Sequence, residues 1–357
     1  MRYFKRYFTG NLSTLSLRLW EFTGSALVNL FVCFLLLLVL SPLSYMVLTS
    51  LKDKAQFLDS KSPIWPAEAE TYAYQGKDYP VYQVLAPDGW HNWALVTPHR
   101  TASDFVDPAH PELGLIHWVG NWRGLSMVYH LTITWNNFVQ LWQAVDYPRY
   151  LRNTLTLVGL GEVGILWSSI AVAYGLSRFR VPGGKYLLIL LIATIVIPDS
   201  ITVIPNFIIF ARVLHWNGTF LPMVVPQFFG GAVYIFLLRQ NFKGIPRDLD
   251  ESAMIDGAGP LRILVSIIVP QCIPAVTTVA LLEFFNVWNE LRVSSLYLGI
   301  RPDLQPISFT AQITPAIGFT PELLQASALL LLIVPIIVLF LAQRFFMQDM
   351  VVTGLEK

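Results

Sequence analysis

The sequence has 357 residues, of which 54% are hydrophobic and only 13% charged, and its formal net charge is +1. Soluble domains carry roughly 25% charged residues, so this composition excludes an ordinary soluble protein and indicates a chain that crosses a lipid membrane several times. The near-neutral charge gives no reason to expect a nucleic-acid partner. The two cysteines, Cys33 and Cys272, lie inside apolar stretches, and the histidines lack ligand spacing, so neither a disulfide framework nor a metal site is expected.

The first 49 residues divide into a basic part and an apolar part. Residues 1–24 carry Arg2, Lys5 and Arg6 among aromatic side chains, which is typical of a cytoplasmic segment at a membrane surface. Residues 25–49 are almost wholly apolar and form a longer run than the core of a signal peptide. This run predicts the first transmembrane helix.

Residues 50–148 are rich in Trp, Tyr, Pro, Asp and His and contain no apolar run long enough to cross a membrane. Short alternating runs at 79–85 and 126–134 suggest strands and turns. We interpret the segment as an extracytoplasmic insert, for which a small β-rich domain is one interpretation. Its tryptophans suit stacking on sugar rings, a domain core or the membrane surface, and the sugar-binding role is the less favoured of these.

Five further apolar stretches predict the remaining spans, at residues 152–176, 186–210, 219–240, 271–297 and 323–343. The predicted fold class is therefore an all-α polytopic membrane protein with six transmembrane helices and an insert between helices 1 and 2. Residues 149–343 form the transmembrane core and residues 344–357 a cytoplasmic tail. Lysine and arginine gather at 177–185 and 239–262, which predicts that these connections and both termini are cytoplasmic and that the insert lies outside.

The fifth span contains several polar residues, among them Asn286, Asn289 and Glu290. Polar side chains at membrane depth are costly and usually face a bundle interior or a water-filled cavity. In a continuous helix, positions 286, 289, 290 and 293 share one face. The three residues are therefore candidates for a polar solute path, and hydrogen bonding between helices is the alternative. Prolines interrupt the third, fourth and sixth spans, which favours irregular helices that line a route.

The segment 245–270 is too polar to span a membrane and too regular to be a simple connection. Pro246 and the acids that follow it suit the first turn of a helix. Gly257 and the pair Gly259-Pro260 then turn the chain. One face of the predicted helix carries Glu251, Met254, Ile255 and Ala258. The pattern predicts a helix–turn–helix beside the membrane, which suits docking onto a partner or packing onto its own protein.

The run Glu251-Ser-Ala-x-x-Asp-Gly-Ala, with Pro270 nineteen residues after the glutamate, resembles the EAA loop of ABC-importer permeases. Other segments resemble the maltose-type carbohydrate permeases of that class, namely Arg152-Asn153-Thr154, Ala173–Phe179, Phe285–Leu291 and Gln343–Phe346. The resemblance covers roughly residues 136–357 and the first span, and it implies half of a transport pore in a bacterial inner membrane. Ser252 replaces the usual second alanine, and the long insert departs from the ordinary maltose-type pattern.

In that family the EAA loop forms a coupling helix that docks into a cleft of a cytoplasmic ATPase. The resemblance implies coupling contacts at Glu251, Ala253, Met254, Ile255, Asp256, Gly257 and Ala258. It also implies a carbohydrate-like solute and four kinds of contact: a second permease subunit, two ATPase subunits, an extracytoplasmic solute-binding protein and membrane lipid. This chain has no Walker-type phosphate-binding loop. No catalytic residue and no cofactor are therefore expected here, and the resemblance assigns ATP and Mg to the ATPase.

Two other functions stay open on the residues alone. A secondary transporter or channel is expected to place ionisable residues in several spans, and the candidates are Glu162, Asp199, Glu283 and Glu290. A membrane-embedded enzyme would use acids of the insert, where no pair has diagnostic spacing among Asp88, Asp104, Asp107 and Glu112. Co-purification of an ATPase would separate the permease from both alternatives.

Overall fold

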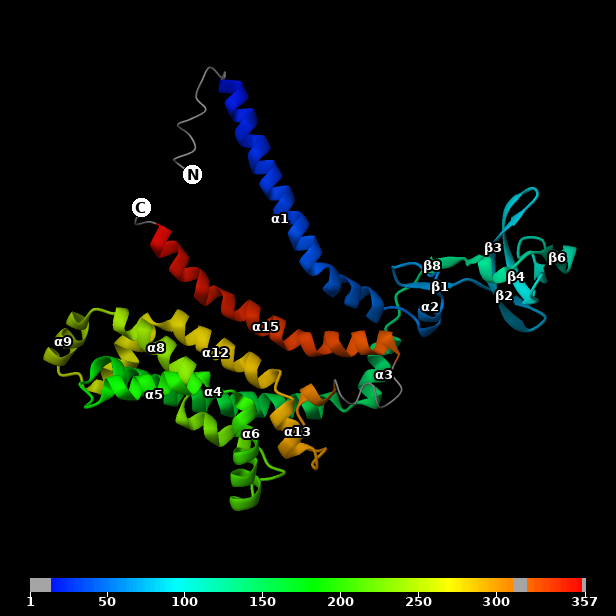
Figure 1. Ribbon diagram of the computed structural model, residues 1–357. Coiled ribbons are helices and arrows are strands. Elements are labelled where there is room, and N and C mark those ends of the chain that lie inside the picture. Colours follow the sequence, from blue (N-terminus) through cyan, green and yellow to red (C-terminus); the bar gives the residue numbers. More distant parts are fainter. Residues whose placement is uncertain (1–13, 311–319, 355–357) are drawn as a thin grey trace. The chain divides into compact units, whose positions relative to one another are not determined.

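The structure is a computed structural model that describes residues 14–310 and 320–354 (Figure 1). It divides into two compact units, with the boundary between Asn137 and Phe138. The predicted cytoplasmic segment 1–24 and tail 344–357 lie partly outside the described residues.

The first unit contains a long helix and a small β-domain. Helix α1 (Thr14–Ser50) includes an apolar stretch, Thr23–Ser50, that is long enough to cross a membrane. The short helix α2 (Lys54–Leu58) begins at Asp53, whose carboxylate accepts a hydrogen bond from the Ala55 N–H. Eight strands follow: β1 (Ala67–Ala69), β2 (Thr71–Tyr74), β3 (Lys77–Ala86), β4 (Gly89–Thr97), β5 (Ala102–Val106), β6 (Ile116–Val119), β7 (Ser126–Met127) and β8 (Tyr129–Leu131).

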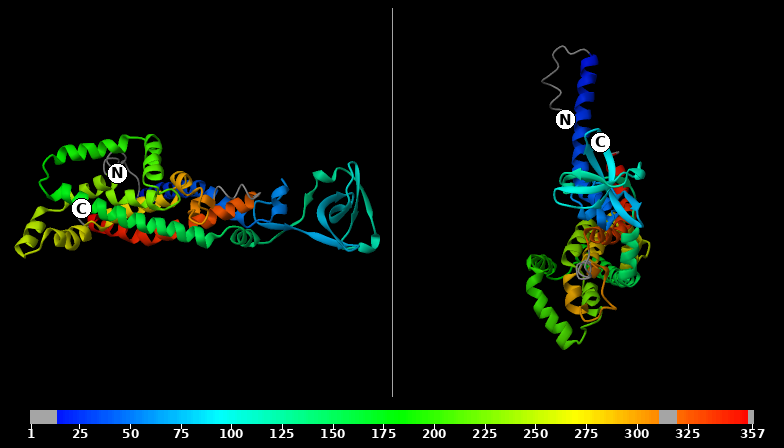
Figure 2. Two further views of the ribbon diagram at one scale, coloured as in Figure 1. Left: turned by 90° about the horizontal axis from the view of Figure 1, so that it is seen from below. Right: turned by 90° about the vertical axis from the view of Figure 1, so that its right-hand side faces the viewer.

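Most of these strands form one antiparallel sheet (Figure 2). The strand order is β2-β3-β4-β5-β6, with β7 beside β3. Strands β1 and β8 form a separate two-stranded ribbon. Alternate residues of a strand face one side of a sheet, and here Val84, Trp93 and Phe105 meet with their neighbours in a small apolar core. The insert therefore contains β-structure, so the label all-α is imprecise and describes only the membrane part of the chain.

The tryptophans of the insert are divided between the core and the surface. Trp93 is buried, and Trp118 and Trp122 pack against the same core. Trp90 and Trp135, by contrast, each expose 64% of their surface. The core interpretation therefore holds for part of the set, and the exposed tryptophans lie on the surface of the unit.

The second unit consists of helices and their connections. The helices from Asn136 onward are α3 (Asn136–Ala144), α4 (Tyr147–Arg178), α5 (Gly184–Val196), α6 (Asp199–Phe207), α7 (Leu221–Val224), α8 (Ala232–Gly244), α9 (Arg247–Ile255), α10 (Pro260–Ile263), α11 (Val269–Gln271), α12 (Ile273–Trp288), α13 (Arg292–Leu298) and α15 (Pro321–Gly354). Two π-helical segments, η4 (Ile208–Val213) and η6 (Leu264–Ile268), and two 3-10 segments, η5 (Val225–Phe229) and η7 (Ile307–Phe309), adjoin them.

Four helical stretches are long and apolar enough to cross a membrane: Thr23–Ser50, Tyr147–Arg178, Leu221–Gly244 and Pro321–Phe345. Two bent helix pairs become further spans if each pair is counted as one. Gly184–Val196 and Ser200–Val213 meet at 98°, and Pro260–Gln271 and Ile273–Trp288 meet at 83°. The described residues therefore provide four to six spans, whereas the sequence predicted six.

Proline accounts for the first of these breaks. Pro198 disfavours helical backbone at the preceding residue, and Ile197 is indeed extended, with φ −73° and ψ 118°. Helix α5 therefore ends at Val196, and α6 starts in a new direction at Asp199. At the second break, Pro270 and Pro274 lie on either side of Cys272, which leaves the helical region with φ −109° and ψ 21°.

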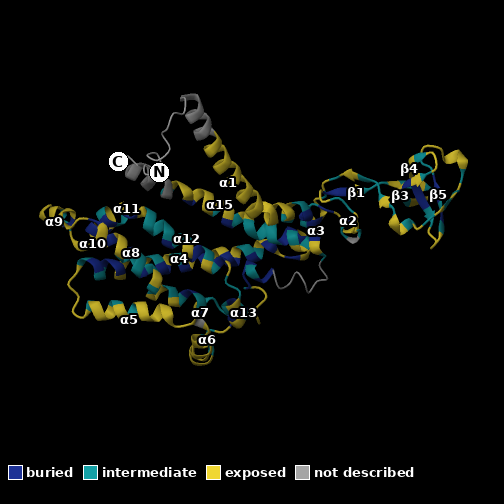
Figure 3. Cartoon of the chain, turned by 45° about the horizontal axis from the view of Figure 1, so that its top comes forward, coloured by how far each residue is buried: buried dark blue, intermediate teal, exposed yellow. Residues whose placement is uncertain are grey.

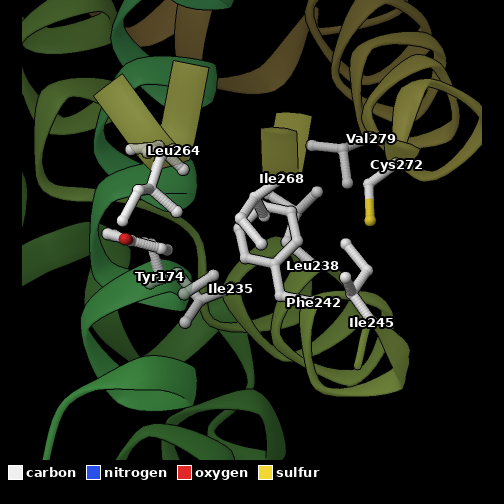
Figure 4. Packing of buried hydrophobic residues seen from close by; sticks show 11 residues of the cluster. Tyr174, Ile235, Leu238, Phe242, Ile245, Leu264, Ile268, Cys272 and Val279 are labelled. Atoms are coloured by element: carbon white, nitrogen blue, oxygen red, sulfur yellow. The ribbon is translucent and has the colours of Figure 1, made fainter. Parts of the chain in front are cut away.

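The buried residues of the second unit concentrate on α4, α8 and α12, whereas α5 is largely exposed (Figure 3). One apolar cluster joins these three helices to the segment between α10 and α12 (Figure 4). Its members are Ala173, Tyr174, Ile235, Leu238, Phe242, Ile245, Ile263, Leu264, Ile268, Cys272 and Val279. This cluster forms the base on which the polar loop 245–270 rests.

Candidate functional site

The loop between α8 and α12 begins with a short helix that ends in a defined turn. Helix α9 starts after Pro246 and carries Asp248 and Asp250 in its first turn, where the helix dipole favours negative charge. After Ile255 the chain turns at Gly257, which has a φ of +82°. That backbone conformation favours glycine, because a side chain there is strained.

The hydrogen bonds of this turn form a Schellman motif. The Gly257 N–H donates to the Met254 carbonyl at 3.0 Å, and the Ala258 N–H donates to the Ala253 carbonyl at 2.8 Å. This pair of bonds satisfies carbonyls that a helix end otherwise leaves without partners. Apart from Gly257 and its chain neighbours, no part of the protein comes within 4 Å of where a Cβ at this position would lie. The backbone conformation, and not a lack of space, therefore calls for glycine.

The predicted coupling residues divide into an outward and an inward group. Met254 is 56% exposed and Ile255 is 87% exposed, and Glu251, Asp256 and Gly257 are exposed as well. Ala253 and Ala258 instead are half-buried against the apolar cluster of Figure 4. Because α9 ends at Ile255, Ala258 does not continue its outward face, which differs from the helical face that the sequence suggested.

An ion pair anchors α9 to the end of α4. The Arg178 Nε lies 3.0 Å from the Asp250 Oδ2, and the two side chains are 6% and 9% exposed. The contact has the geometry of an ion pair and not of a linear hydrogen bond. Both terminal nitrogens of Arg178 also donate to the Ile245 carbonyl at 3.1 Å. The sequence does not indicate this anchor, because the two residues are far apart in the chain and neither stands out in its own segment.

A cavity of about 280 Å³ lies between α4, α6, η5, α12 and α13. Its polar side chains include Thr202, Asn206, Gln227, Asn286, Glu290 and Arg292, and its aromatic side chains are Phe210 and Tyr297. Only Asn286 and Glu290 among these residues could be predicted from the sequence, because the polar residues of α6 and η5 stand singly in apolar surroundings. Polar groups that converge with aromatic rings in one cavity are typical of a site for a small polar molecule.

The three candidate path residues occupy different positions. Asn286 and Glu290 line this cavity, whereas Asn289 is not among its lining residues and donates from Nδ2 to the Phe285 carbonyl at 2.8 Å. Helix α12 ends at Trp288, so the four positions that the sequence placed on one helical face do not lie on one helix.

Glu290 also has a structural role, because its carboxylate binds the first turn of the next helix. Its Oε1 accepts a hydrogen bond from the Val293 N–H at 2.6 Å, at the start of α13. Its carbonyl accepts hydrogen bonds from the hydroxyls of Ser294 and Ser308. Hydrogen bonding between segments, the alternative that the sequence left open, is therefore present at this residue beside its place in the cavity wall.

Close packing of α4 against η5 shapes one wall of the cavity. A Cβ at Gly164 would come within 2.7 Å of the Phe228 ring, so this glycine allows the two segments to approach. The Ser168 hydroxyl donates to the Gln227 carbonyl at 3.0 Å. These contacts fix the backbone of Gln227, whose side chain faces the cavity.

Two acids of the membrane core lie next to this wall. Glu283 is 1% exposed and interacts with the side chains of Tyr234 and Asn286. A Cβ built at Gly161, which lines the cavity, would lie 3.8 Å from the Glu283 Oε1. Glu162 lies near enough to Glu283 for their charges to interact. Glu283 therefore connects the buried core to the cavity residue Asn286.

The motif Arg152-Asn153-Thr154 holds the connection between α13 and η7 in place. The Asn153 Nδ2 donates to the carbonyls of Asp303 and Gln305 at 2.8 and 3.1 Å, and the Thr154 Oγ1 accepts from the Ile307 N–H at 2.7 Å. These contacts give a packing role to residues that the sequence singled out by resemblance. Among the described residues, no group of histidine, cysteine and acidic side chains could hold a metal ion.

Membrane-spanning helices that enclose a polar cavity, joined by a polar loop with an exposed apolar tip, define a transport protein of the permease class. The chain belongs to the family described as "Binding-protein-dependent transport system inner membrane component", which matches residues 164–352. It is therefore a permease subunit of an ABC importer and not an enzyme. This membership confirms the resemblance drawn from the EAA-type loop, and it sets aside the secondary-transporter and membrane-enzyme alternatives.

Curated relatives carry the names of uptake permeases. The chain is 34% identical over 235 residues to the "Osmoprotective compounds uptake permease protein GgtD" of Synechocystis sp., which covers 65% of this chain and 77% of that protein. It is 30% identical over 225 residues to the "Alpha-glucoside transport system permease protein AglG" of Rhizobium meliloti, which covers 61% of this chain and 59% of that protein. The "Melibiose/raffinose/stachyose import permease protein MelC" of Bacillus subtilis is 26% identical over 231 residues, 62% of this chain and 81% of that protein.

A solved structure shares the fold over nearly the whole chain. It belongs to a bacterial ABC transporter described as "involved in the import of the acidic polysaccharide alginate". The match covers 95% of this chain and 100% of that chain, with a TM-score of 0.57 and 19% sequence identity. This likeness supports the permease fold, including its membrane-spanning character.

Proposed function

We propose that the chain forms half of the translocation path of an ATP-driven importer for a carbohydrate-like solute, with α9 as its coupling helix. The exposure of Ile255, at 87%, carries this proposal. A large apolar side chain at the tip of an anchored helix contributes a stabilising free energy only if a partner covers it. The charged side chains of Glu251 and Asp256 flank this tip and suit the rim of such an interface.

The coupling residues would have two kinds of role. Met254 and Ile255 would enter a cleft of the ATPase. The turn at Gly257 would set the direction of the chain after α9. Ala253 and Ala258 would hold the loop against its own core, which their packing supports. ATP-driven closure of two ATPase subunits would then move α9, and the packed core beneath it would carry the movement into the membrane helices.

The side chains that line the cavity between α4 and α13 favour a hydroxyl-rich solute. Asn206, Gln227 and Asn286 supply amide donors and acceptors, and Tyr297 supplies an aromatic surface. Such groups suit a sugar, whose ring has an apolar face and a hydroxyl edge. The names of relatives that transport alpha-glucosides and melibiose support the same class of solute.

The proposal includes the assembly and its orientation. The partners would be a second permease subunit, two ATPase subunits that bind ATP and Mg, and an extracytoplasmic solute-binding protein. The family description, which refers to binding-protein-dependent transport, supports this assembly. The basic segments at 177–185 and 239–262 support cytoplasmic termini and an outer insert in a bacterial inner membrane.

A mild-detergent pull-down from the native membrane tests the proposal. We expect the chain to recover a second permease and an ATPase with nucleotide-stimulated activity. The variant Ile255→Glu should lose the ATPase, because a buried interface does not accept an unpaired charge. Ile300, which is 70% exposed outside α9, gives the matched control Ile300→Glu, which should retain it. Recovery of the chain without any ATPase, or equal recovery from both variants, would refute the proposed coupling.

A further inference from the structure

The insert gathers its arginines in one groove. This groove, of about 670 Å³, is lined by Pro98, His99, Arg100, Asn121, Trp122 and Arg123. Arg100 and Arg123 are the only two arginines between residues 50 and 137 of the sequence, and both line it. None of the six lining residues is acidic, so the groove has a positive character.

The histidines of the insert also differ in whether they lie beside an acidic side chain. Four of them lie within 3.1 Å of a carboxylate, and these are His91, His110, His117 and His130. The fifth, His99, lines the groove, and within the described residues its side chain forms no ion pair, nor do those of Arg100 and Arg123. Residues 50–137 contain nine Asp and Glu and six Lys and Arg side chains, so a shortage of acids does not explain why these two arginines have no ion pair.

The backbone around the groove is held in place from within the insert. Ser103 is fully buried, and its hydroxyl accepts from the His99 N–H at 3.0 Å and donates to the His99 carbonyl at 3.3 Å. The Lys61 ammonium donates to the three successive carbonyls of residues 123–125 at 2.6 to 3.2 Å. These bonds hold the backbone of both loops that carry the arginines, so less of the loop backbone needs to be ordered when a ligand binds.

The side chains of the groove offer three kinds of contact. Guanidinium groups bind a carboxylate in a bidentate manner. The indole of Trp122, with the Arg123 guanidinium over its ring at 5.4 Å from the centroid, lines the groove and gives an apolar contact for the C–H side of a sugar ring. The Asn121 amide can pair with hydroxyls.

From this combination we infer that the groove binds a carboxylate-bearing sugar unit of the uronate type. The inference rests on the proposed function, because it gives a chemical class to a saccharide that the importer handles. An acidic side chain of a partner protein would also engage the two arginines. It would leave no use for the indole and the amide beside them, so we favour the sugar acid.

Calorimetric titration of the full-length chain in lipid nanodiscs, with no solute-binding protein present, tests this inference. The probes are trigalacturonate and the neutral trisaccharide maltotriose. We expect only trigalacturonate to bind, with an affinity that falls as salt is added. Arg100→Gln and Arg123→Gln should each weaken binding by about tenfold or more, because each removes a charge-assisted hydrogen-bond donor. Lys77→Gln removes the same charge from an exposed site outside the groove and should leave the affinity unchanged.

Equal binding of the two trisaccharides, or trigalacturonate binding that neither arginine variant weakens, would overturn the inference. The inference would also be overturned if trigalacturonate did not bind and the arginine variants weakened only the association of a purified solute-binding protein. The groove would then be a contact for that protein. The ATPase pull-down is independent of the groove and should succeed with both arginine variants. Its failure would therefore count against the proposed function, and not against the groove.

Discussion

Arg178, the last residue of α4, and Asp250, on α9, form a buried ion pair with Nε and Oδ2 3.0 Å apart. The pair joins a membrane-spanning helix to the helix that we propose docks on the ATPase. Because the Arg178 guanidinium also binds the Ile245 carbonyl, α9 cannot tilt without disturbing the end of α4. If α9 is the coupling helix, as we propose, this contact would be a direct route by which its movement reaches the membrane.

Removal of one partner of this pair should be strongly destabilising. We expect Asp250→Ala to lower the free energy of unfolding by about 3–5 kcal/mol, because it leaves the Arg178 charge buried and unpaired. Asp248→Ala, at an exposed position of the same helix, should change it by less than roughly 0.5 kcal/mol. Thermal unfolding of the purified chain measures both.

The double variant Arg178→Met/Asp250→Leu separates the stabilising role of the pair from its role in coupling. Replacement of a buried ion pair by apolar side chains is often neutral for stability, so we expect the double variant to recover most of what Asp250→Ala loses. Solute-stimulated ATP hydrolysis in the assembled transporter should stay reduced. Full recovery of that hydrolysis would show that packing alone, without the ion pair, transmits the movement.

Gly257→Ala should weaken coupling more than it weakens the fold. A side chain at φ +82° costs about 1 kcal/mol, and the relaxed turn would point α9 in a different direction. We expect a several-fold loss of transport at nearly normal ATPase binding. The control Gly259→Ala has ordinary backbone, with φ −77°, and should transport normally. Equal transport rates for the two variants would contradict the role proposed for the turn at Gly257 in orienting α9.

Asn286 and Asn289 provide a matched pair of residues for a test of the proposed solute path. Asn286 lines the cavity, whereas the Asn289 side chain donates a hydrogen bond to the Phe285 carbonyl in the last turn of α12. We expect Asn286→Leu to raise the KM for solute uptake by about tenfold, because a bound hydroxyl loses its partner, and Asn289→Leu to change it little. Uptake assays in reconstituted vesicles distinguish the two. If Asn289→Leu proves the more harmful, the path does not run through this cavity.

The hydroxyl of Tyr129 donates to the Asp59 Oδ2 at 2.7 Å in the insert. Burial, and then this bond, raises the pKa of Tyr129 above its usual value. The folded insert therefore holds this proton where the unfolded chain has lost it, so its stability should fall as the pH rises above about 10. Ultraviolet difference titration of the native chain against Tyr129→Phe should reveal one tyrosine that ionises late. A tyrosine that ionises in the usual range would contradict the predicted shift.

Local patterns of the sequence predicted much of the architecture. Long apolar runs indicated the positions of α1, α4 and α15, because a membrane span requires an unbroken stretch of such residues. The alternation at residues 79–85 indicated β3, and the acids after Pro246, together with Gly257, indicated α9 and its turn. In each case the deciding interactions lie within a few residues of one another.

Features that depend on distant contacts could not be predicted in this way. The break after Trp288 has no proline or glycine to announce it, and the Glu290 carbonyl that follows accepts a hydrogen bond from the hydroxyl of Ser308, a residue further along the chain. The inward packing of Ala258 and the pairing of Arg178 with Asp250 depend on how α4 meets the loop. The groove of the insert brings together two loops that the sequence separates by strands β5 and β6.

Site-specific photo-crosslinking in native membranes tests the central claim, the docking of α9 on an ATPase, most directly. A photoreactive amino acid would replace Ile255 in one variant and Ile300 in another, since both positions are largely exposed. We predict that position 255 crosslinks to a protein with a Walker-type nucleotide-binding loop and that position 300 does not. Crosslinks from position 255 to lipid alone, or the same ATPase crosslink from both positions, would contradict the assignment of α9 as the coupling helix.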